Sequence, residues 1–178
     1  ITNHTIDFNG SLTELTRKFD AVILAAGSWA DRKLGVDGED LEGVFGCIDF
    51  LAQLYRGDIT ALKEKVAVIG VGDAAYDLAR VLSRIGADVS IVSWFDKDKI
   101  PADPEEIVAV AEEGIPVIDN TQVVAFEGSN GRFERLRCRP TKAGEPDANG
   151  IAWPVVIKGS VDFALEFDRV FVAIGQNG

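Results

Sequence analysis

The chain has 178 residues, 47% hydrophobic and 26% charged, which is typical of a globular protein with one good core. Its 18 basic and 29 acidic residues give a net charge of −11, which argues against nucleic acid and anionic membranes as partners. No apolar run approaches the roughly 20 residues of a membrane-spanning helix. One histidine and two distant cysteines argue against a zinc site, an iron–sulfur cluster or a thiol redox pair, and favour a reducing cytoplasm.

The amino-terminal part of the chain predicts a short helix and then a buried strand. The helix is expected from Ser11, as its N-cap, to Lys18, with Glu14 at the spacing of a capping box. The apolar run 21–26 ends at Gly27 and predicts a buried parallel strand.

The next segment predicts little regular structure. Four glycines among acidic residues indicate a loop or linker over 28–46. A short amphipathic helix is expected over 48–55, and a linker follows over 56–64.

The stretch 65–92 predicts a strand, a glycine turn, a helix and a second strand, which is the first half of a dinucleotide-binding βαβ unit. Gly70 permits a tight turn, and Gly72 lacks the Cβ that would keep a pyrophosphate away from the backbone. Ala75 is small enough for close packing of helix on strand. A helix that begins near Asp73 offers unpaired N–H groups to phosphates. The cofactor-binding residues expected from this unit are Gly70, Gly72, Asp73, Ala74 and Ala75.

The remainder of the chain predicts a helix, a hairpin and a closing strand. The helix is expected over 103–113, and Asn130-Gly131 is the turn signal of a hairpin over 123–138. A loop rich in glycine and proline is expected over 142–150. A buried strand over 168–174 ends at Gly175, and further strands are expected over 115–118, 155–158 and 163–167.

Two segments of the chain have similar sequences. They read FDAVILAAG (19–27) and FDRVFVAIG (167–175), and each joins Phe-Asp to an apolar strand that ends in Ala-x-Gly. With a GxGxxA unit between these segments, the chain resembles the two-dinucleotide flavoproteins, which are FAD-dependent pyridine nucleotide oxidoreductases. Further motifs in matching order and spacing make it similar to the small (beta) subunit of NADPH-dependent glutamate synthase: GVDGED (35–40), DFL (49–51), DAAYD (73–77) and AIGQ (173–176). The region 141–155 is the least similar.

The resemblance implies a division of the chain and a fold. Residues 1–55 would be the carboxyl-side part of the first FAD-domain segment and a hinge, and residues 56–178 would be the NAD(P)H-binding domain. The expected fold is α/β, with a Rossmann-like parallel sheet, helices on both of its faces and a β-hairpin or meander at one edge. Because methionine is absent, even at position 1, we expect the chain to be part of a longer polypeptide.

The resemblance also implies an activity for the intact protein. Hydride would pass from NADPH or NADH to FAD, which the rest of the FAD domain would hold, and electrons would pass on to iron–sulfur clusters or another redox partner subunit. The chain alone would show no dehydrogenase turnover. Asp77 is expected near the nicotinamide end of the cofactor, and Gly175 at the end of the closing strand is a further candidate.

The end of the second strand of the βαβ unit departs from the family pattern. An acid there normally binds the ribose of NAD, and arginines hold the 2′-phosphate of NADP. This chain has Trp94-Phe95 where an arginine pair is expected, and Ser93 where an acid stands in NAD-specific relatives. Lys97 and Lys99 are candidates for a 2′-phosphate, although lysine lacks a bidentate fork. We expect Ser93, Trp94 and Lys97 beside the adenosine, and the choice between NADPH and NADH stays open.

Other interpretations of the same residues stay open. The glycine turn is also compatible with a Rossmann-like turn that binds nothing, or with the S-adenosylmethionine site of a methyltransferase. Trp94 and Phe95 would stack on an adenine, be buried, or contact a subunit, and Asp77 would otherwise be a solvated charge. For the whole chain, the alternatives are a degenerate docking module and a nucleotide sensor that passes no electrons.

Overall fold

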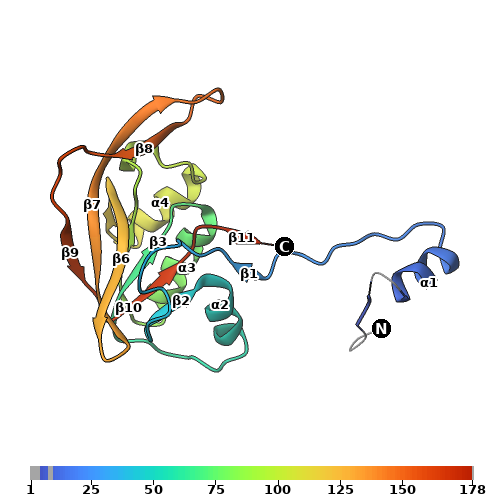
Figure 1. The fold of residues 1–178 in the computed structure, drawn as a ribbon. Helices are drawn as coiled ribbons and strands as arrows, with labels where there is room; N and C mark the ends of the chain where they lie inside the picture. Colours follow the sequence, from blue (N-terminus) through green and yellow to red (C-terminus); the bar gives the residue numbers. More distant parts are fainter. Residues whose placement is uncertain (1–4, 8–9, 178) are drawn as a thin grey trace.

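The body of the protein has three layers in a computed structural model that describes residues 5–7 and 10–177 (Figure 1). The middle layer is a parallel sheet with the strand order β2 (Val44–Gly46), β10 (Arg169–Val172), β3 (Lys65–Ile69), β4 (Asp88–Val92) and β5 (Val117–Ile118). One outer layer contains the helices α2 (Cys47–Tyr55), α3 (Asp73–Arg84) and α4 (Pro104–Glu112). The other is an antiparallel sheet of β6 (Thr121–Ser129), β7 (Arg132–Pro146), β8 (Ala152–Val156) and β9 (Phe163–Glu166).

The parallel strands are apolar on both faces because both faces are covered. On the helix side, strand residues pack with the buried faces of α2, α3 and α4; they are Val66, Val68, Val89, Ile91 and Phe171. On the other side, strand residues pack against the antiparallel sheet; they are Ala67, Ile69, Val92, Val170 and Val172. The βαβ unit predicted over 65–92 is therefore confirmed as the centre of the fold.

The α/β class is confirmed, but the expectation of helices on both faces is wrong. The helices of the body share one core with one face of the sheet, and Phe126, Phe133 and Leu136 of the hairpin strands cover the other face. The physical reason lies in β6 and β7, whose alternating pattern gives their sheet one apolar face. Such a face covers a parallel sheet as completely as a layer of helices does.

The apolar run 21–26 is not a buried strand, contrary to prediction. It is extended and exposed, and Ile23 retains 90% of its accessible surface. Together with α1 (Ser11–Lys18), it reaches away from the body (Figure 1). Within the described ranges no strand pairs with this run, and a strand needs a neighbour to satisfy its backbone groups.

The predicted capping box of α1 is also absent. Gly10 is the N-cap of this helix and makes no side-chain cap hydrogen bond. The hydroxyl of Ser11 instead accepts a hydrogen bond from the backbone N–H of Asp7 at 2.8 Å. The helix itself is confirmed over Ser11–Lys18.

The predicted hairpin is confirmed, and it is longer than expected. Asn130 and Gly131 have positive φ angles of 51° and 78°, as a tight hairpin turn requires, and they join β6 to β7. The loop expected over 142–150 is largely strand, because β7 continues to Pro146 and pairs with β8. We call residues 141–156 the β7–β8 arm; it stands at the top of the molecule in Figure 1.

Two short strands lie in the segment predicted as a loop over 28–46. Strand β1 (Ala30–Asp31) pairs with β11 (Gln176–Asn177), and β2 forms the edge of the parallel sheet beside β10. Strand β2 and α2 precede residue 56, yet they pack in the body. The division of the whole protein at 55/56 stays a prediction. None of the helices in the described ranges is long and apolar enough to cross a membrane.

Phe171 packs against aromatic residues of two other elements of the body. Its ring is fully buried, meets the edge of Phe50 at 4.6 Å between centroids, and stacks on Phe45 at 5.6 Å. It therefore joins β10, β2 and α2.

We expect Phe171→Ala to lower the free energy of unfolding by about 3–5 kcal/mol, because it leaves a cavity between three elements. Urea denaturation measures this change. Val108→Ala, at an exposed position of α4, serves as the control and should stay within about 0.5 kcal/mol of the wild type. Similar losses in the two variants would contradict this account of the core.

The two glycines of the β3–α3 turn have different surroundings. Gly70 has a φ of +138°, and a Cβ there would overlap the carbonyl oxygen of Ala173. Gly72 is the N-cap of α3 with a φ of −89°, and a Cβ there would meet no atom within 4 Å. The fold therefore requires glycine at position 70 but not at position 72.

We expect Gly70→Ala to destabilise the protein by at least about 2 kcal/mol, from strained backbone and overpacking together. Gly72→Ala should cost no more than about 1 kcal/mol, the usual range for an N-cap change. Thermal and urea melts of the two variants measure the difference. Equal destabilisation would show that this packing does not govern the turn.

Candidate functional site

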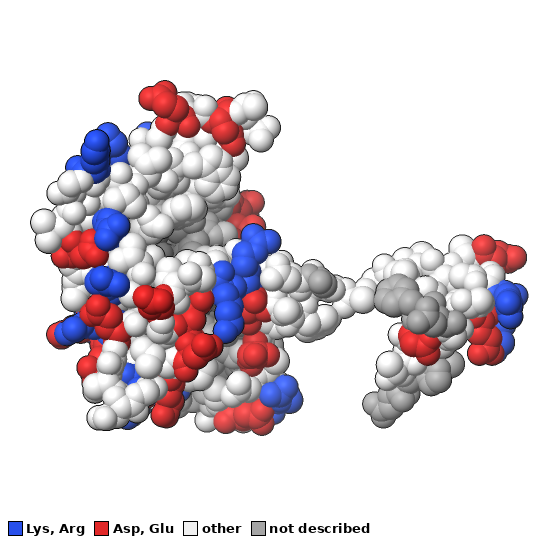
Figure 2. Space-filling model, viewed as in Figure 1, with Lys and Arg blue, Asp and Glu red and all other residues white. Residues whose placement is uncertain are grey.

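A cleft of about 710 Å³ opens at the carboxyl edge of the parallel sheet. It lies where β3, β4 and β10 end, and the chain crosses there from β3 through α3 to β4. Figure 2 shows the surface hollowed below the β7–β8 arm, with basic side chains beside the hollow. In open α/β sheets, ligands bind outside the carboxyl ends of the strands at the point where the strand order reverses, and here that point is beside β3, which has β4 on one side and β10 on the other. The cleft is therefore the candidate site of this protein.

The floor of the cleft is the glycine turn and the beginning of α3. Gly70, Gly72 and Ala74 line it, and no side-chain hydrogen bond caps the helix. The N–H groups of a first helical turn have no partner within the helix, and the helix dipole makes this end positive. Because Gly72 leaves open space in front of these groups, the floor is suited to an anion such as a phosphate.

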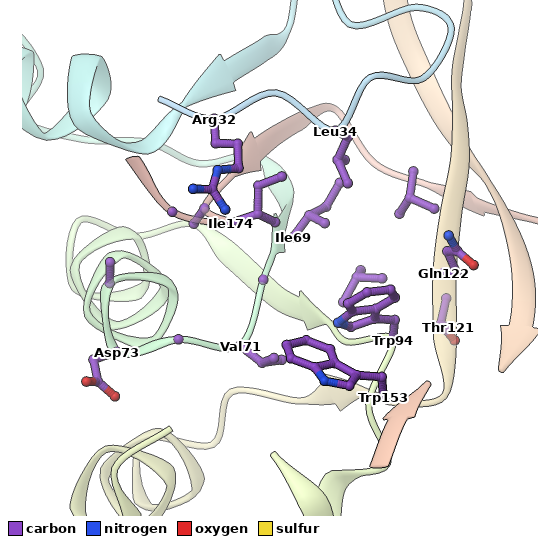
Figure 3. Close-up of a pocket in the computed structure, with 17 residues that line it drawn as sticks. Arg32, Leu34, Ile69, Val71, Asp73, Trp94, Thr121, Gln122, Trp153 and Ile174 are labelled. Carbon is purple, nitrogen blue, oxygen red and sulfur yellow. The ribbon is translucent and has the colours of Figure 1, made fainter. Parts of the chain in front are cut away.

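Asp73 also lines the cleft, and its carboxylate has a backbone partner. The carboxylate accepts a hydrogen bond from the backbone N–H of Asp103 at 3.0 Å, and Figure 3 shows it pointing away from the tryptophan rings. Asp103 in turn caps α4 by accepting the N–H of Glu105 at 2.9 Å. The side chain of Asp73 thus ties the beginnings of α3 and α4 together.

Two tryptophans form one wall of the cleft (Figure 3). Trp94 follows β4, and Trp153 comes from β8 in the β7–β8 arm. Their ring centroids lie 6.2 Å apart with the planes tilted by 58°. The two residues retain 39% and 47% of their accessible surface. Thr121 and Gln122 at the start of β6 continue the same wall.

Arg32 lies on the opposite side of the cleft, near Ile174 (Figure 3). Its backbone N–H donates to the carbonyl of Gly175 at 3.0 Å, which fixes this segment beside the end of β10. The preceding Asp31 accepts the N–H of Ile48 at 3.1 Å, at the beginning of α2. Of the described residues, Arg32 is the only lysine or arginine that lines the cleft, and no salt bridge holds its guanidinium.

Six of the residues predicted from the sequence line the cleft together: Gly70, Gly72, Asp73, Ala74, Trp94 and Gly175. Their part in binding stays a prediction, since the structure contains no ligand. Sequence reasoning missed several lining residues, of which the polar and aromatic ones are Arg32, Thr121, Gln122 and Trp153. Arg32 lies in the segment predicted as a loop over 28–46, and Trp153 lies between the predicted loop 142–150 and the predicted strand 155–158. No local pattern indicates that the fold brings either residue to this edge.

Four predicted residues lie outside the lining. Ala75 is fully buried beneath the turn, where it packs below Gly70. Ser93 is fully buried, and its hydroxyl donates to the carbonyl of Phe95 at 2.8 Å. Asp77 is exposed on α3, and Lys97 is exposed in a short 3₁₀ turn, Lys97–Lys99. The binding roles of these four residues also stay predictions.

The two cysteines are unpaired and buried, as small hydrophobic residues. Burial, with Asp31 and Asp77 nearby, raises the pKa of the Cys47 thiol to about 11. Burial, with Asp162 nearby, raises the pKa of the Cys138 thiol to about 12. Both are therefore neutral thiols at pH 7, and neither is poised as a nucleophile.

The sequence has relatives among characterised oxidoreductases. The beta subunit of NADPH-Fe(3+) oxidoreductase from Geobacter sulfurreducens is 39% identical over 174 residues, which are 94% of this chain and 25% of that protein. The small chain of NADPH glutamate synthase from Halomonas elongata is 34% identical over 173 residues, which are 91% of this chain and 36% of that protein. The chain thus spans well under half the length of these relatives.

Solved structures share the fold. FprA from Mycobacterium tuberculosis in complex with NADPH has a TM-score of 0.76 at 19% identity, over 93% of this chain and 52% of FprA. Thioredoxin reductase from T. acidophilum has a TM-score of 0.61 at 19% identity, over 82% of this chain and 41% of that one. Residues 3–178 match the family described as pyridine nucleotide-disulphide oxidoreductase. The chain belongs to this family, which confirms the family predicted from its sequence.

Proposed function

We propose that this chain binds NADPH or NADH in the cleft and presents the nicotinamide to an FAD held by the rest of the protein. The observation that supports this most directly is the uncapped beginning of α3, which opens past Gly72 into the cleft. Backbone N–H groups of Asp73 and Ala74 would hold the pyrophosphate. Arg32 would add positive charge from the other side, where it is free of acidic partners in the described structure.

In this proposal the protein binds and orients, and the cofactors supply the redox chemistry. When bound, the nicotinamide would supply a hydride for the flavin. The family to which the chain belongs, the name of the Geobacter relative and the NADPH complex of FprA support this assignment. Asp77 stays a candidate for the nicotinamide end, although it lies outside the cleft lining.

The segment before the body supports a second part of the proposal. Ile23 and Leu24 are exposed apolar residues in an extended run, as expected for a strand whose neighbours belong to the FAD domain. We therefore retain the division in which residues 1–55 belong to the FAD-domain segment and hinge. Electrons would leave the flavin for iron–sulfur clusters or another redox partner subunit, and several relatives carry names of subunits. A cytoplasmic location also stays a prediction.

Titration of the purified protein with NADH and with NADPH tests nucleotide binding. Trp94 lines the cleft with a half-exposed ring, so binding should quench tryptophan fluorescence with a saturable curve. Gly72→Val should weaken binding at least about tenfold, or about 1.4 kcal/mol, because its side chain would occupy the space in front of α3.

Gly72→Ala is the matched control and should weaken binding less than Gly72→Val, while both variants keep the circular dichroism spectrum of the wild type. Failure of the wild type to bind either nucleotide at millimolar concentration would contradict the proposal and favour the docking-module alternative. Unchanged affinity in Gly72→Val would show that the nucleotide does not use the beginning of α3.

The tryptophan wall also predicts the basis of cofactor choice. In the described part of the cleft no lysine or arginine stands on the side of Trp94, so no cation there would pair with a 2′-phosphate. Trp94→Arg would supply a bidentate guanidinium. We expect this variant to shift the ratio of the NADH and NADPH dissociation constants toward NADPH by about tenfold, with a smaller shift at high salt.

Trp94→Leu removes the same ring without adding charge and is the control for this experiment. It should weaken both nucleotides alike and leave the ratio near that of the wild type. If Trp94→Arg leaves the ratio unchanged, or if Trp94→Leu shifts it equally, the 2′-phosphate lies elsewhere.

A further inference from the structure

The β7–β8 arm positions Trp153 at the cleft through a side-chain hydrogen bond. The indole Nε1–H of Trp153 donates to Oδ2 of Asp147 at 2.9 Å. The other carboxylate oxygen of Asp147 accepts the backbone N–H groups of Asn149 at 2.8 Å and Ile151 at 3.0 Å. These bonds hold the pKa of Asp147 below its usual range, with the tryptophan bond as the largest cause. The carboxylate of Asp147 therefore both shapes the turn between β7 and β8 and orients the ring of Trp153.

The base of the arm is tied to the other tryptophan. The buried hydroxyl of Thr141, in β7, donates to the carbonyl oxygen of Trp94 at 2.7 Å. Phe95 lies behind both residues, 5.7 Å from the centroid of each indole. The two indoles thus share one support and are tilted rather than stacked on each other. Both side chains line the same side of the cleft.

This wall brings two exposed tryptophans together in one concave site. Each of the two residues retains more than a third of its accessible surface. Aromatic rings of this size contribute most of their binding energy when they are covered. Apolar walls with a few polar groups are typical of small-molecule sites. Gln122, beside the rings in Figure 3, provides an amide with both a donor and an acceptor.

The position of the wall determines which part of a dinucleotide it meets. The beginning of α3 would hold the pyrophosphate, and the end of the second strand of a βαβ unit lies beside the adenosine ribose. Trp94 follows β4, which is that second strand. The flat, uncharged group on this side of the pyrophosphate is the adenine, and aromatic faces bind bases by stacking.

We propose that Trp153, presented by the β7–β8 arm, is a further binding residue whose ring stacks on the purine base of the dinucleotide, while the tilted ring of Trp94 contacts the edge of the same base. The inference rests on the proposed function, since it takes the occupant of the cleft to be a pyridine dinucleotide. It assigns a role to a segment whose sequence is expected to be the least similar to the small subunit of glutamate synthase. The arm would bind the base, while the glycine turn holds the phosphates.

Calorimetric titration of the purified protein with three probes tests the inference: NADH, ADP-ribose, which lacks the nicotinamide, and reduced nicotinamide mononucleotide, which lacks the adenosine. Trp153→Leu should weaken NADH and ADP-ribose by the same factor, about tenfold for the loss of one stacked face. Binding of the mononucleotide should not change. Trp153→Phe keeps an aromatic face at a size close to that of leucine and should restore most of the affinity.

Trp29→Leu removes an exposed tryptophan outside the cleft lining and serves as the control, with no change for any probe. If the wild type binds neither NADH nor ADP-ribose, the proposed function fails. If the wild type binds both and Trp153→Leu binds them as tightly, the inference fails while the proposed function stands. The inference is also overturned if Trp153→Leu weakens the mononucleotide as much as ADP-ribose, or if Trp153→Phe is no better than Trp153→Leu.

Discussion

The close approach of β3 and β10 at their carboxyl ends is the constraint on which the candidate site depends. The carbonyl of Ala173 occupies the place of a side chain at Gly70, so the chain can turn off β3 only with glycine there. This turn sets the beginning of α3 directly above the edge of the sheet. The unpaired N–H groups of the helix therefore face the same space as the ends of β4 and β10. The tryptophan wall and Arg32 complete a site whose floor this contact has already fixed.

The parts of the fold that the sequence predicts well are those whose cause is local. Strand, glycine turn and helix over 65–92 follow from hydrophobic period and glycine spacing, and Asn130-Gly131 specifies a hairpin by its own backbone preference. The run 21–26 has the composition of a buried strand, but burial depends on neighbours, and the described chain offers it none. Whether helices or strands cover a face is likewise decided by distant segments, here β6 and β7.

The residues of the candidate site also divide into those that local sequence predicts and those that depend on distant segments. The glycine turn is predictable because its chemistry lies in consecutive residues. Ser93 and Trp94 are adjacent, yet successive side chains beyond a strand point to opposite sides, so one is buried and the other faces the cleft. Arg32 and Trp153 reach the cleft through the pairing of β1 with β11 and of β7 with β8. Those pairings join residues far apart in the chain, and no local pattern encodes them.

The β7–β8 arm gives the two ends of the cleft unequal rigidity. The floor rests on a sheet buried between two layers. The wall that carries Trp153 lies where β7 has left β6 and β9 and pairs with β8 alone, and two paired strands are less stable than three or more. Local opening should therefore occur at the wall more often than at the floor. A nucleotide leaving this cleft would first release its base and last its pyrophosphate, so residence time would follow the dynamics of the arm more than the strength of the phosphate contacts.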